Sequence, residues 1–493
     1  MYELIMGLET HVRVNSKTKM FCGCKNAVEL EGDPNINTCT FCMGFPGALP
    51  VLNEEVVNLA TKAGLAMKCT INNVSVFDRK SYFYPDLPTG YQITQLYYPI
   101  AEHGTVEAYV NGELKSFKIH RMHIECDAGK LVHAGNKTLC DYNRSGSPLM
   151  EIVTEPDFRT KEDVIEYLTE LQKIMRFVGA SNADMEKGQL RCDVNISLRL
   201  KGETTLRNRV EIKNLNSFSA IARAIDTEFK RQVKIYESGG TIDQETRGWD
   251  DEKGVSNSLR SKEDAMDYRY FPEPDLKPLV LTDEYIAERV IKELPIDRRK
   301  KYLEEYKLLD DDARILSNDR TLGDIFEGII IRTKDPKKAC SFITTVLFAI
   351  LKESLRDVQW WSVDEMVYTI SHIINLLNKD ELSSTSGKQV FEEYYKIMEE
   401  ELEKTRNHNV LNEKDTIDFI EKIIDRLGLR QKNDTEALAK IVDEVLANSS
   451  SQIEQYKSGK VNLFGYFVGE CMKASKGQGN PKIFSELIKN KIG

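Results

Sequence analysis

The segment 190–200 constrains the fold more than any other part of the chain, because its apolar and polar residues alternate without a break. In a β-strand, successive side chains point to opposite faces of the sheet. One face would carry Leu190, Cys192, Val194, Ile196 and Leu198, and the other Arg191, Asp193, Asn195, Ser197 and Arg199. This pattern is typical of an antiparallel sheet with one face in water. Asp, Asn and Arg suit metal and phosphate contact, although a solvated sheet face explains them equally well at this point.

The composition predicts a soluble globular enzyme of several domains. A length of 493 residues indicates two to four domains, and 41% hydrophobic with 30% charged residues is ordinary for such proteins. No apolar run approaches the roughly 20 residues that cross a bilayer, and the N-terminus lacks the basic start of a signal peptide. Ten unevenly spread cysteines do not indicate a secreted disulfide scaffold. We therefore expect a protein of the cytoplasm or an organelle matrix, with no membrane association.

Three parts follow one another along the chain, and together they predict an α+β fold. Residues 1–292 alternate strand-like runs with turns, residues 293–406 read as helices, and residues 407–493 form a small helical tail. The predicted strands are 5–14, 92–100, 105–110, 115–125 and a hairpin of 190–200 with 204–213, and the predicted helices include 162–177 and 218–236. The first domain should contain a mixed, mostly antiparallel sheet.

The charge is unevenly distributed. The formal net charge is -10, which argues against nucleic-acid binding over the whole surface. Residues 457–493, however, contain seven Lys and two Glu and no Asp or Arg, which leaves +5. Such a basic end can contact a polyanion, and it can equally be an ordinary solvated helix surface.

Four cysteines form two close pairs, Cys22 with Cys24 and Cys39 with Cys42, separated by 14 residues. Two thiolate pairs on either side of a loop suit tetrahedral Zn²⁺. The first pair has one intervening residue instead of the usual two to four, so four unrelated thiols stay an alternative. Four protein ligands leave no open position, and the predicted zinc is therefore structural.

Carboxylates and histidines recur on strand-like segments of the first domain. Glu9 and His11 share a face, as do His123 and Glu125, and Glu151 and Asp193 lie on further segments. Carboxylates with imidazole are ligands for Mg²⁺ or Mn²⁺, although each set alone is compatible with a surface strand.

The expected hairpin partner adds positive charge to the same face. Arg209, Glu211 and Lys213 share a face of segment 204–213. A metal beside such a wall is what phosphoryl transfer needs. The sequence contains no P-loop, G-x-G-x-x-G, kinase signature or G-x-S-x-G motif, so a nucleotide site would be of a less common kind.

The chain resembles the B subunits of the glutamine-dependent aspartyl/glutamyl-tRNA amidotransferases. The similar stretches include GLETH (7–11), FDRKSYFYPD (77–86), PLMEIVTEPD (148–157) and DYRYFPEPD (267–275). Further similar stretches are 90–93, 125–130, 141–144, 190–199, 211–218, 244–247, 469–474 and 480–481. Together these stretches cover essentially the whole chain in order.

The resemblance implies a function. A cradle-shaped, kinase-like first domain would hold Mg²⁺ and use ATP to phosphorylate the side-chain carboxylate of misacylated Glu-tRNA(Gln) or Asp-tRNA(Asn). Ammonia from an amidase, the A subunit, would then displace the phosphate. A small C subunit would complete a heterotrimer, and the helical and tail domains would bind tRNA. The resemblance assigns Mg²⁺ binding to Glu9, His11, Glu125 and Glu151, and catalysis to these residues and to Asp193.

Other roles are added to these. We expect Arg191, Arg209 and Lys213 to contact phosphate or the tRNA 3′ end, and Lys80 and Tyr82 to line the ammonia exit. Lys473, Lys476 and Lys482 of the basic tail would contact tRNA phosphates.

Departures from the family pattern and rival functions are also visible. Cys126 stands where a second acid is common, and Ser81 and Thr89 replace Asn and Lys. The cysteine quartet occurs in some family members only. A non-catalytic tRNA-binding protein or chaperone with the same fold is the alternative function. The archaeal-type relative carries an inserted domain, for which the short segment from Pro272 to Pro295 leaves no room.

Overall fold

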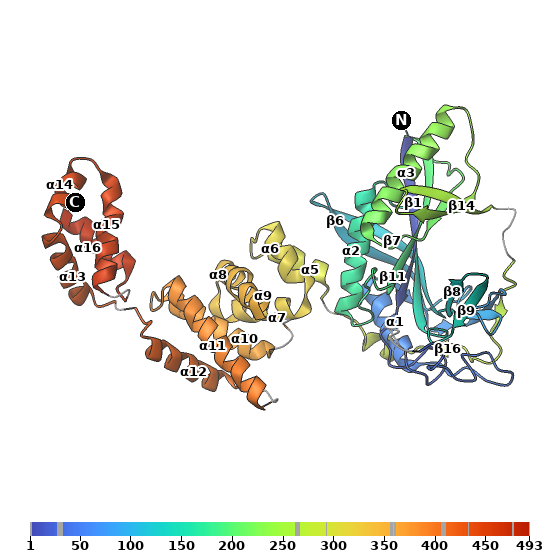
Figure 1. The fold of residues 1–493 in the computed structure, drawn as a ribbon, viewed down its shortest axis with the longest axis horizontal. Helices are drawn as coiled ribbons and strands as arrows, with labels where there is room; N and C mark the ends of the chain where they lie inside the picture. The colour runs from blue at the N-terminus through green and yellow to red at the C-terminus, as the bar shows by residue number, and fades with distance from the viewer. Residues whose placement is uncertain are drawn as a thin grey trace. The chain divides into compact units, whose positions relative to one another are not determined.

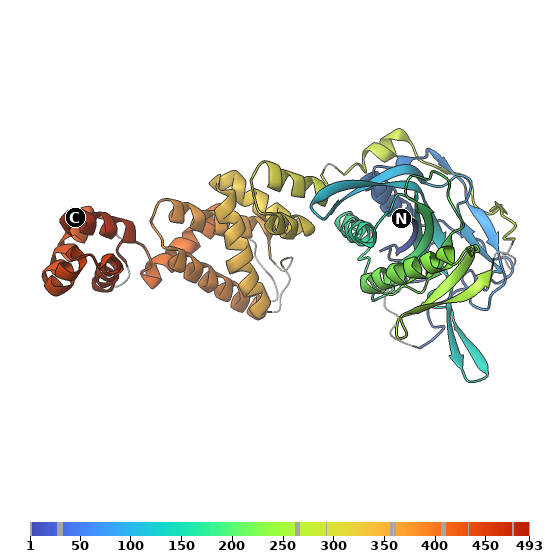
Figure 2. The ribbon, with the colours of Figure 1, turned by 90° about the horizontal axis from the view of Figure 1, so that it is seen from above.

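The computed structural model describes residues 2–26, 33–261, 267–291, 293–354, 358, 361–405, 411–431, 433–475 and 478–492. The chain forms two compact units, Met1–Asp297 and Arg298–Gly493. Figures 1 and 2 show the first unit as a sheet with helices against it and the second as helices throughout. None of the helices in the described stretches combines the length and the apolar character that crossing a membrane requires.

The first unit is built on a sheet of nine strands in the order β14-β13-β12-β11-β1-β10-β7-β6-β2. Neighbouring strands are antiparallel throughout except for the parallel pair β12 and β13. The bounds are β1 (Tyr2–Arg13), β2 (Thr70–Ile71), β6 (Ala101–Val110), β7 (Glu113–Cys126), β10 (Pro148–Thr154), β11 (Leu190–Leu200), β12 (Val210–Lys213), β13 (Glu245–Asp250) and β14 (Val255–Ser261). The predicted α+β fold with a large, mostly antiparallel sheet is confirmed.

The described part of this unit also contains three smaller sheets. They are β15-β4-β5, β16-β3 and β8-β9. Their strands are β3 (Val74–Ser75), β4 (Asp78–Ser81), β5 (Tyr91–Thr94), β8 (Lys130–Ala134), β9 (Lys137–Asp141), β15 (Phe271–Pro272) and β16 (Leu279–Val280). Strand β5 packs next to β7, so the sheet β15-β4-β5 forms a wall beside this strand of the large sheet.

Helices cover the apolar face of the large sheet. Helices α1 (Glu54–Ala66), α2 (Lys161–Phe177) and α3 (Phe218–Glu237) share one hydrophobic core with the strands, and α2 and α3 lie side by side (Figures 1 and 2). A capping box between Thr160 and Asp163 fixes the start of α2. The short helix α4 (Asp283–Ala287) follows near the end of the unit. The polar face is therefore the face left for chemistry.

Strand β11 has the predicted two faces, since Leu190, Cys192, Val194, Ile196 and Leu198 are all buried. The predicted partner strand 204–213 is wrong in its first half, because only Val210–Lys213 is a strand. Glu203 accepts hydrogen bonds from the backbone of Leu200 and the side chain of Arg207, and these contacts hold a loop before β12.

The predicted strand 92–100 is likewise shorter, and β5 ends at Thr94. Leu96 donates its backbone N–H to the buried carboxylate of Asp78 at 2.8 Å. Ile100 donates to the side-chain carbonyl of Gln95 at 3.2 Å. These backbone groups are satisfied by side chains, so the segment needs no further strand pairing.

The second unit is helical in its described parts. Its helices are α5 (Pro295–Glu304), in which the boundary falls, α6 (Asp310–Asn318), α7 (Arg320–Thr333), α8 (Pro336–Phe342), the π-helix η2 (Ile343–Leu347), α9 (Phe348–Ser354), α10 (Val363–Asn378), α11 (Ser384–Thr405), α12 (Glu413–Leu427), α13 (Thr435–Ala447), α14 (Ser450–Lys457), the 3₁₀ helix η4 (Val461–Leu463), α15 (Phe464–Ala474) and α16 (Pro481–Ile492). The helical region that the sequence predicts is confirmed.

This unit contains two hydrophobic clusters. The first includes Tyr302, Phe391 and, from α12, Ile420 and Ile424. The second joins α13, α15 and α16 around Phe467. Helix α12, assigned to the tail from the sequence, thus packs with the preceding helices. The division into domains 1–292, 293–406 and 407–493 stays a prediction, and its second boundary lies outside the described residues.

Candidate active site

The polar face of the sheet carries one row of charged side chains across four neighbouring strands. The register pairs Arg191 of β11 with His11 of β1, His11 with Glu151 of β10, and Glu151 with His123 of β7. Since adjacent strands lie about 4.8 Å apart, these side chains lie within contact distance. Glu125, two residues after His123 on the same strand, shares this face.

Glu151 lies at the centre of this row, between two imidazoles. Its Oε2 is 3.3 Å from His11 Nε2 and 3.4 Å from His123 Nε2. Glu125 is 3.6 Å from His123 and 3.9 Å from His11, and Thr94 donates its hydroxyl to Glu125 at 3.0 Å. Two overlapping sets of possible metal ligands result, Glu9–His11–Glu151 and His123–Glu125–Glu151, each with its ligand atoms within 4.8 Å of one another.

The charges in this row depend on one another. Burial lowers the pKa of His11 and of His123, but the hydrogen bonds and charges of Glu151 and Glu125 outweigh burial and raise each pKa to about 9. Burial raises the pKa of Glu151, but the two imidazoles hold it well below its usual range. Glu9 has a raised pKa because of burial and the charge of Glu151. Buried carboxylates in this number need positive charge beside them.

A second acidic group adjoins the row. Glu9, Asp193 and Glu211 bring their carboxylate oxygens within 4.8 Å of one another, because Glu9 pairs with Asp193 in the register of β1 and β11. The ammonium group of Lys213 lies between two of them, 2.6 Å from Asp193 and 3.1 Å from Glu211. Lys213, expected to contact phosphate, therefore has two carboxylate partners in this structure.

The wall formed by β4, β5 and β15 places Lys80 and Tyr82 at the edge of the site. The ammonium nitrogen of Lys80 is 4.9 Å from the centre of the Tyr268 ring, which also contacts the ring of Tyr82 edge to face. Burial lowers the pKa of Lys80, but the charges of Glu125, Tyr270 and Glu151 outweigh burial and raise it. This lysine is thus a cation that faces the carboxylates.

The remaining described cationic residues that the sequence predicts have exposed side chains. Arg191 has a side chain 45% exposed, and Arg209 is exposed just before β12. In the tail, Lys473 pairs with Glu470 at 2.6 Å and Lys482 with Asp380 at 2.7 Å. Lys476 lies outside the described residues.

The four cysteines converge as a possible metal centre. The sulfur atoms of Cys22, Cys24, Cys39 and Cys42 all lie within 4.8 Å of one another, with Cys39 and Cys42 at 3.7 Å and Cys24 and Cys42 at 4.0 Å. Tetrahedral zinc with Zn–S bonds of about 2.3 Å separates its sulfur ligands by about 3.8 Å. Hydrogen bonding from Cys22 holds the pKa of Cys42 down to about 4, while the same contact raises the pKa of Cys22. The donor set therefore fits a metal whose charge would let all four thiols ionise together.

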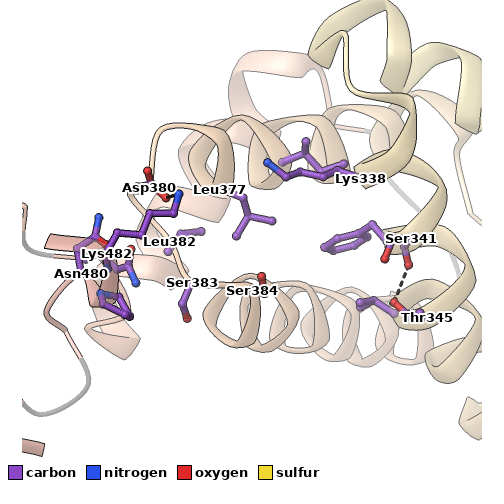
Figure 3. A pocket seen from close by; sticks show the side chains of 15 residues that line it. Lys338, Ser341, Thr345, Leu377, Asp380, Leu382, Ser383, Ser384, Asn480 and Lys482 are labelled. Carbon is purple, nitrogen blue, oxygen red and sulfur yellow. Dashed lines mark hydrogen bonds and ion pairs between the residues drawn. The ribbon is translucent and has the colours of Figure 1, made fainter. Parts of the chain in front are cut away.

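A further pocket lies in the second unit (Figure 3). It has a volume of about 470 Å³, and Phe342, Ile374, Leu377 and Leu382 form its apolar lining. Lys482 and Asp380 lie at its rim and form an ion pair. It lies in a different unit from the carboxylates of the large sheet.

Comparisons with known proteins identify the family. Residues 4–287 match the model of the GatB/GatE catalytic domain, and residues 324–492 match the model of the GatB domain. The Persephonella marina protein named as the B subunit of aspartyl/glutamyl-tRNA(Asn/Gln) amidotransferase is 43% identical over 99% of this chain and 98% of its own length. Equally named proteins of a Thermoanaerobacter species and of Myxococcus xanthus are 40% and 41% identical, over 100% of this chain and 99% of their own. The chain belongs to the family of amidotransferase B subunits.

The catalytic-domain match contains every candidate residue of the sheet. The predicted Mg²⁺ ligand set of Glu9, His11, Glu125 and Glu151 leaves out two members of these groups, His123 and Glu211. Alternation alone places His123 on the face of Glu125, and the same rule places Glu211 beside Lys213. At Cys126, the departure from the family pattern, burial raises the pKa of the thiol, so this side chain adds no charge.

Proposed function

We propose that this chain activates the side-chain carboxylate of a misacylated tRNA, Glu-tRNA(Gln) or Asp-tRNA(Asn), with ATP and passes it to ammonia. The observation that carries the proposal is the row His11–Glu151–His123, flanked by Glu9 and Glu125, on one face of four strands. It lies within the part of the chain that matches the GatB/GatE catalytic domain. Relatives named as B subunits of aspartyl/glutamyl-tRNA(Asn/Gln) amidotransferase support the substrate class.

The chemistry requires two steps. A carboxylate is a poor electrophile, so an oxygen of the aminoacyl side chain first attacks the γ-phosphorus of ATP, and ADP leaves. Ammonia then attacks the carbonyl carbon of the acyl phosphate, loses a proton, and inorganic phosphate leaves. The first step brings two anions together, and its barrier is lowered chiefly by positioning and by neutralising charge.

The residues fit a divalent cation. Glu9, His11 and Glu151 would hold Mg²⁺, with Glu125 and Asp193 beside them, because oxygen ligands and one imidazole suit this ion. The bound cation would supply charge neutralisation to the phosphates of ATP. His123 Nε2 lies 3.4 Å from Glu151 and 3.6 Å from Glu125, and this pairing would hold both carboxylates in their orientation. Thr94 fixes Glu125 from the neighbouring sheet.

The wall of Lys80 and Tyr82 is the proposed ammonia exit. Lys80 keeps a positive charge beside the carboxylates, and this charge disfavours the ammonium ion relative to neutral ammonia, the nucleophilic form. An amidase, the A subunit of the assembly, would supply the ammonia, and a small C subunit would complete the heterotrimer.

The tail is the proposed tRNA contact, with Lys473, Lys476 and Lys482 as phosphate partners. Lys473 and Lys482 have side chains 76% and 75% exposed. Each would exchange its present carboxylate partner for a phosphate, and binding should weaken as salt rises. The cysteine quartet would hold structural zinc and fix the segments around Cys22 and Cys42.

Reconstitution tests the proposal. The chain is combined with the amidase, the small third chain, ATP, Mg²⁺, glutamine and either Glu-tRNA(Gln) or Asp-tRNA(Asn). The expected product is Gln-tRNA or Asn-tRNA, formed only when ATP is present. Failure with both misacylated tRNAs would refute the function, whereas full activity of Glu125→Ala would favour a non-catalytic role.

A further inference from the structure

A cluster of three arginines lies beside the carboxylate row, and the function above does not use it as a unit. Asp127, directly after β7, is the carboxylate that Arg13, Arg144 and Arg191 share. Its Oδ2 is 3.3 Å from Arg144 Nε, and 3.9 Å from Arg13 Nε and from an amino nitrogen of Arg191. The three arginines come from β1, the segment before β10, and β11.

Asp127 lies close to all three guanidinium groups, but its Oδ2 is not hydrogen-bonded to them. Asp127 is 7% exposed, yet its Oδ2 accepts no hydrogen bond from the described residues. The guanidinium groups are thus held near the carboxylate without committing donors to this oxygen. Among the described residues, Asp127 is the one carboxylate within 4.0 Å of Arg144 and Arg191, and two guanidinium groups beside one carboxylate attract a further anion.

The three arginine side chains differ in their contacts and in their exposure to solvent. Arg144 is fixed by donating to the backbone carbonyls of Ala128 at 3.0 Å and Gly129 at 2.5 Å. The side chain of Arg13 is 10% exposed. Arg191 makes no hydrogen bond with the described chain and has a side chain 45% exposed, so its planar fork of donors faces outward. One arginine held in place and one buried arginine, beside a third whose donors are exposed, form an arrangement suited to binding an anion.

The cluster lies where an anion would meet the catalytic row. Arg13 follows His11 by two residues on the same face of β1, and Arg191 lies directly opposite His11 in the register of β1 and β11. On the other side of His11 lie the acidic residues Glu9 and Asp193. The polar face therefore changes from acidic to basic along β1, with His11 between the two regions.

We propose that Arg13, Arg144 and Arg191, organised by Asp127, bind a phosphate group and present it to the carboxylate row. Guanidinium groups bind phosphate oxygens with paired, charge-assisted hydrogen bonds. The phosphate belongs to ATP or to the 3′ end of the tRNA, and this choice of ligand rests on the function proposed above. The site itself requires only phosphate chemistry.

The test measures binding, not turnover, on the assembled heterotrimer. Titration calorimetry with a Mg²⁺ complex of a non-hydrolysable ATP analogue forms one arm, and titration with uncharged tRNA at several salt concentrations forms the other. Arg144→Gln and Arg191→Gln remove donors, and Arg191→Lys keeps the charge. Arg199→Gln is the matched control, because Arg199 lies on the same face of β11 but pairs with Glu3 at 2.6 Å.

If the phosphate is that of ATP, both Gln variants should weaken analogue binding about 10- to 100-fold, the loss of a hydrogen bond to a charged group. Arg191→Lys should recover part of this loss, and Arg199→Gln should bind like the parent protein. If the phosphate is that of tRNA, analogue binding stays constant and the salt dependence of tRNA binding falls by about one ion per arginine. Unchanged binding in both arms refutes the site. Absence of analogue binding by the parent complex would instead contradict the proposed ATP-dependent function.

Discussion

Replacing Glu151 by Gln should nearly abolish ATP-dependent amidation while leaving the protein folded. Glu151 is the one carboxylate that belongs to both ligand sets identified on the sheet, Glu9–His11–Glu151 and His123–Glu125–Glu151. Gln keeps the shape of the side chain but removes its charge. Both imidazoles then lose the partner that lies 3.3 and 3.4 Å away.

The magnitude follows from these contacts. Removing one preorganised electrostatic contact from an active site typically slows catalysis about 10²- to 10³-fold, and a cation bound by fewer charges should require more Mg²⁺ for half-maximal activity. The free energy of unfolding should fall by about 1–3 kcal/mol, the cost of unpaired buried groups. Larger losses are not expected, because His11 and His123 can release their protons and become neutral.

The assay is glutamine-dependent amidation of Glu-tRNA(Gln) by the assembled complex over a range of Mg²⁺ concentrations, with thermal melting as the check on folding. The matched control is Glu155→Gln, because Glu155 follows the same strand but pairs with the exposed His120. If Glu151→Gln stays within about threefold of the parent rate at every Mg²⁺ concentration, a difference too small for a lost transition-state contact, the carboxylate row is not the catalytic centre.

Four further outcomes follow from the structure. The purified protein should contain about one zinc per chain, and Cys39→Ser should lose it in elemental analysis; a full complement in this variant would refute the four-thiolate site. Asp163→Asn should lower the free energy of unfolding by about 1–2 kcal/mol, since Asp163 caps α2 and pairs with Lys115. The pKa of Asp163 is lowered in the folded state, because the hydrogen bonds from Lys115 and from the start of the helix outweigh burial. The higher free energy of unfolding of the parent protein is therefore present above the ordinary pKa of 3.8 and should vanish as the pH falls through the lowered pKa. A difference in stability that persists in acid denaturation would contradict the assignment. Lys80→Met should leave glutamine hydrolysis intact but lower the yield of amidated tRNA per glutamate released; an unchanged ratio would exclude the ammonia-exit role. Lys473→Ala should reduce the salt dependence of tRNA binding by about one ion, and an unchanged slope would place the tRNA contact elsewhere.

Local periodicity explains what could be predicted from the sequence. Alternation correctly identified β11 and its buried face, and the spacing of apolar residues identified α2 and α3, because both patterns depend only on neighbours in the chain. The convergence of Glu9, His11, Glu125 and Glu151 depends instead on which strands pair and in which register. No local pattern specifies that β10 lies between β1 and β7. The prediction that these four residues share one site therefore came from the resemblance to a family.

Side-chain contacts explain the strands that were predicted too long. The carboxylate of Glu203 satisfies the backbone of Leu200 and binds Arg207, whose guanidinium also lies 5.0 Å from the centre of the Tyr236 ring. These contacts stabilise a loop where alternation alone favours a strand. Asp78 has the corresponding effect after Thr94. The contacts of Glu203 are local, whereas those of Asp78 with Leu96 and of Tyr236 with Arg207 join residues distant in the chain. Sequence periodicity registers neither kind of contact.

The most direct test of the central claim is a single-turnover experiment with [α-³²P]ATP, whose label stays in ADP, and the assembled complex, in the absence of glutamine and ammonia. The proposal predicts that ADP forms only when a misacylated tRNA is present, and that added ammonia then converts the charged tRNA to its amidated form without further ATP. The Glu151→Gln complex should fail at the first step. Amidated tRNA formed without consumption of ATP, or ADP formed equally with uncharged tRNA, would contradict the assignment of carboxylate activation to this sheet.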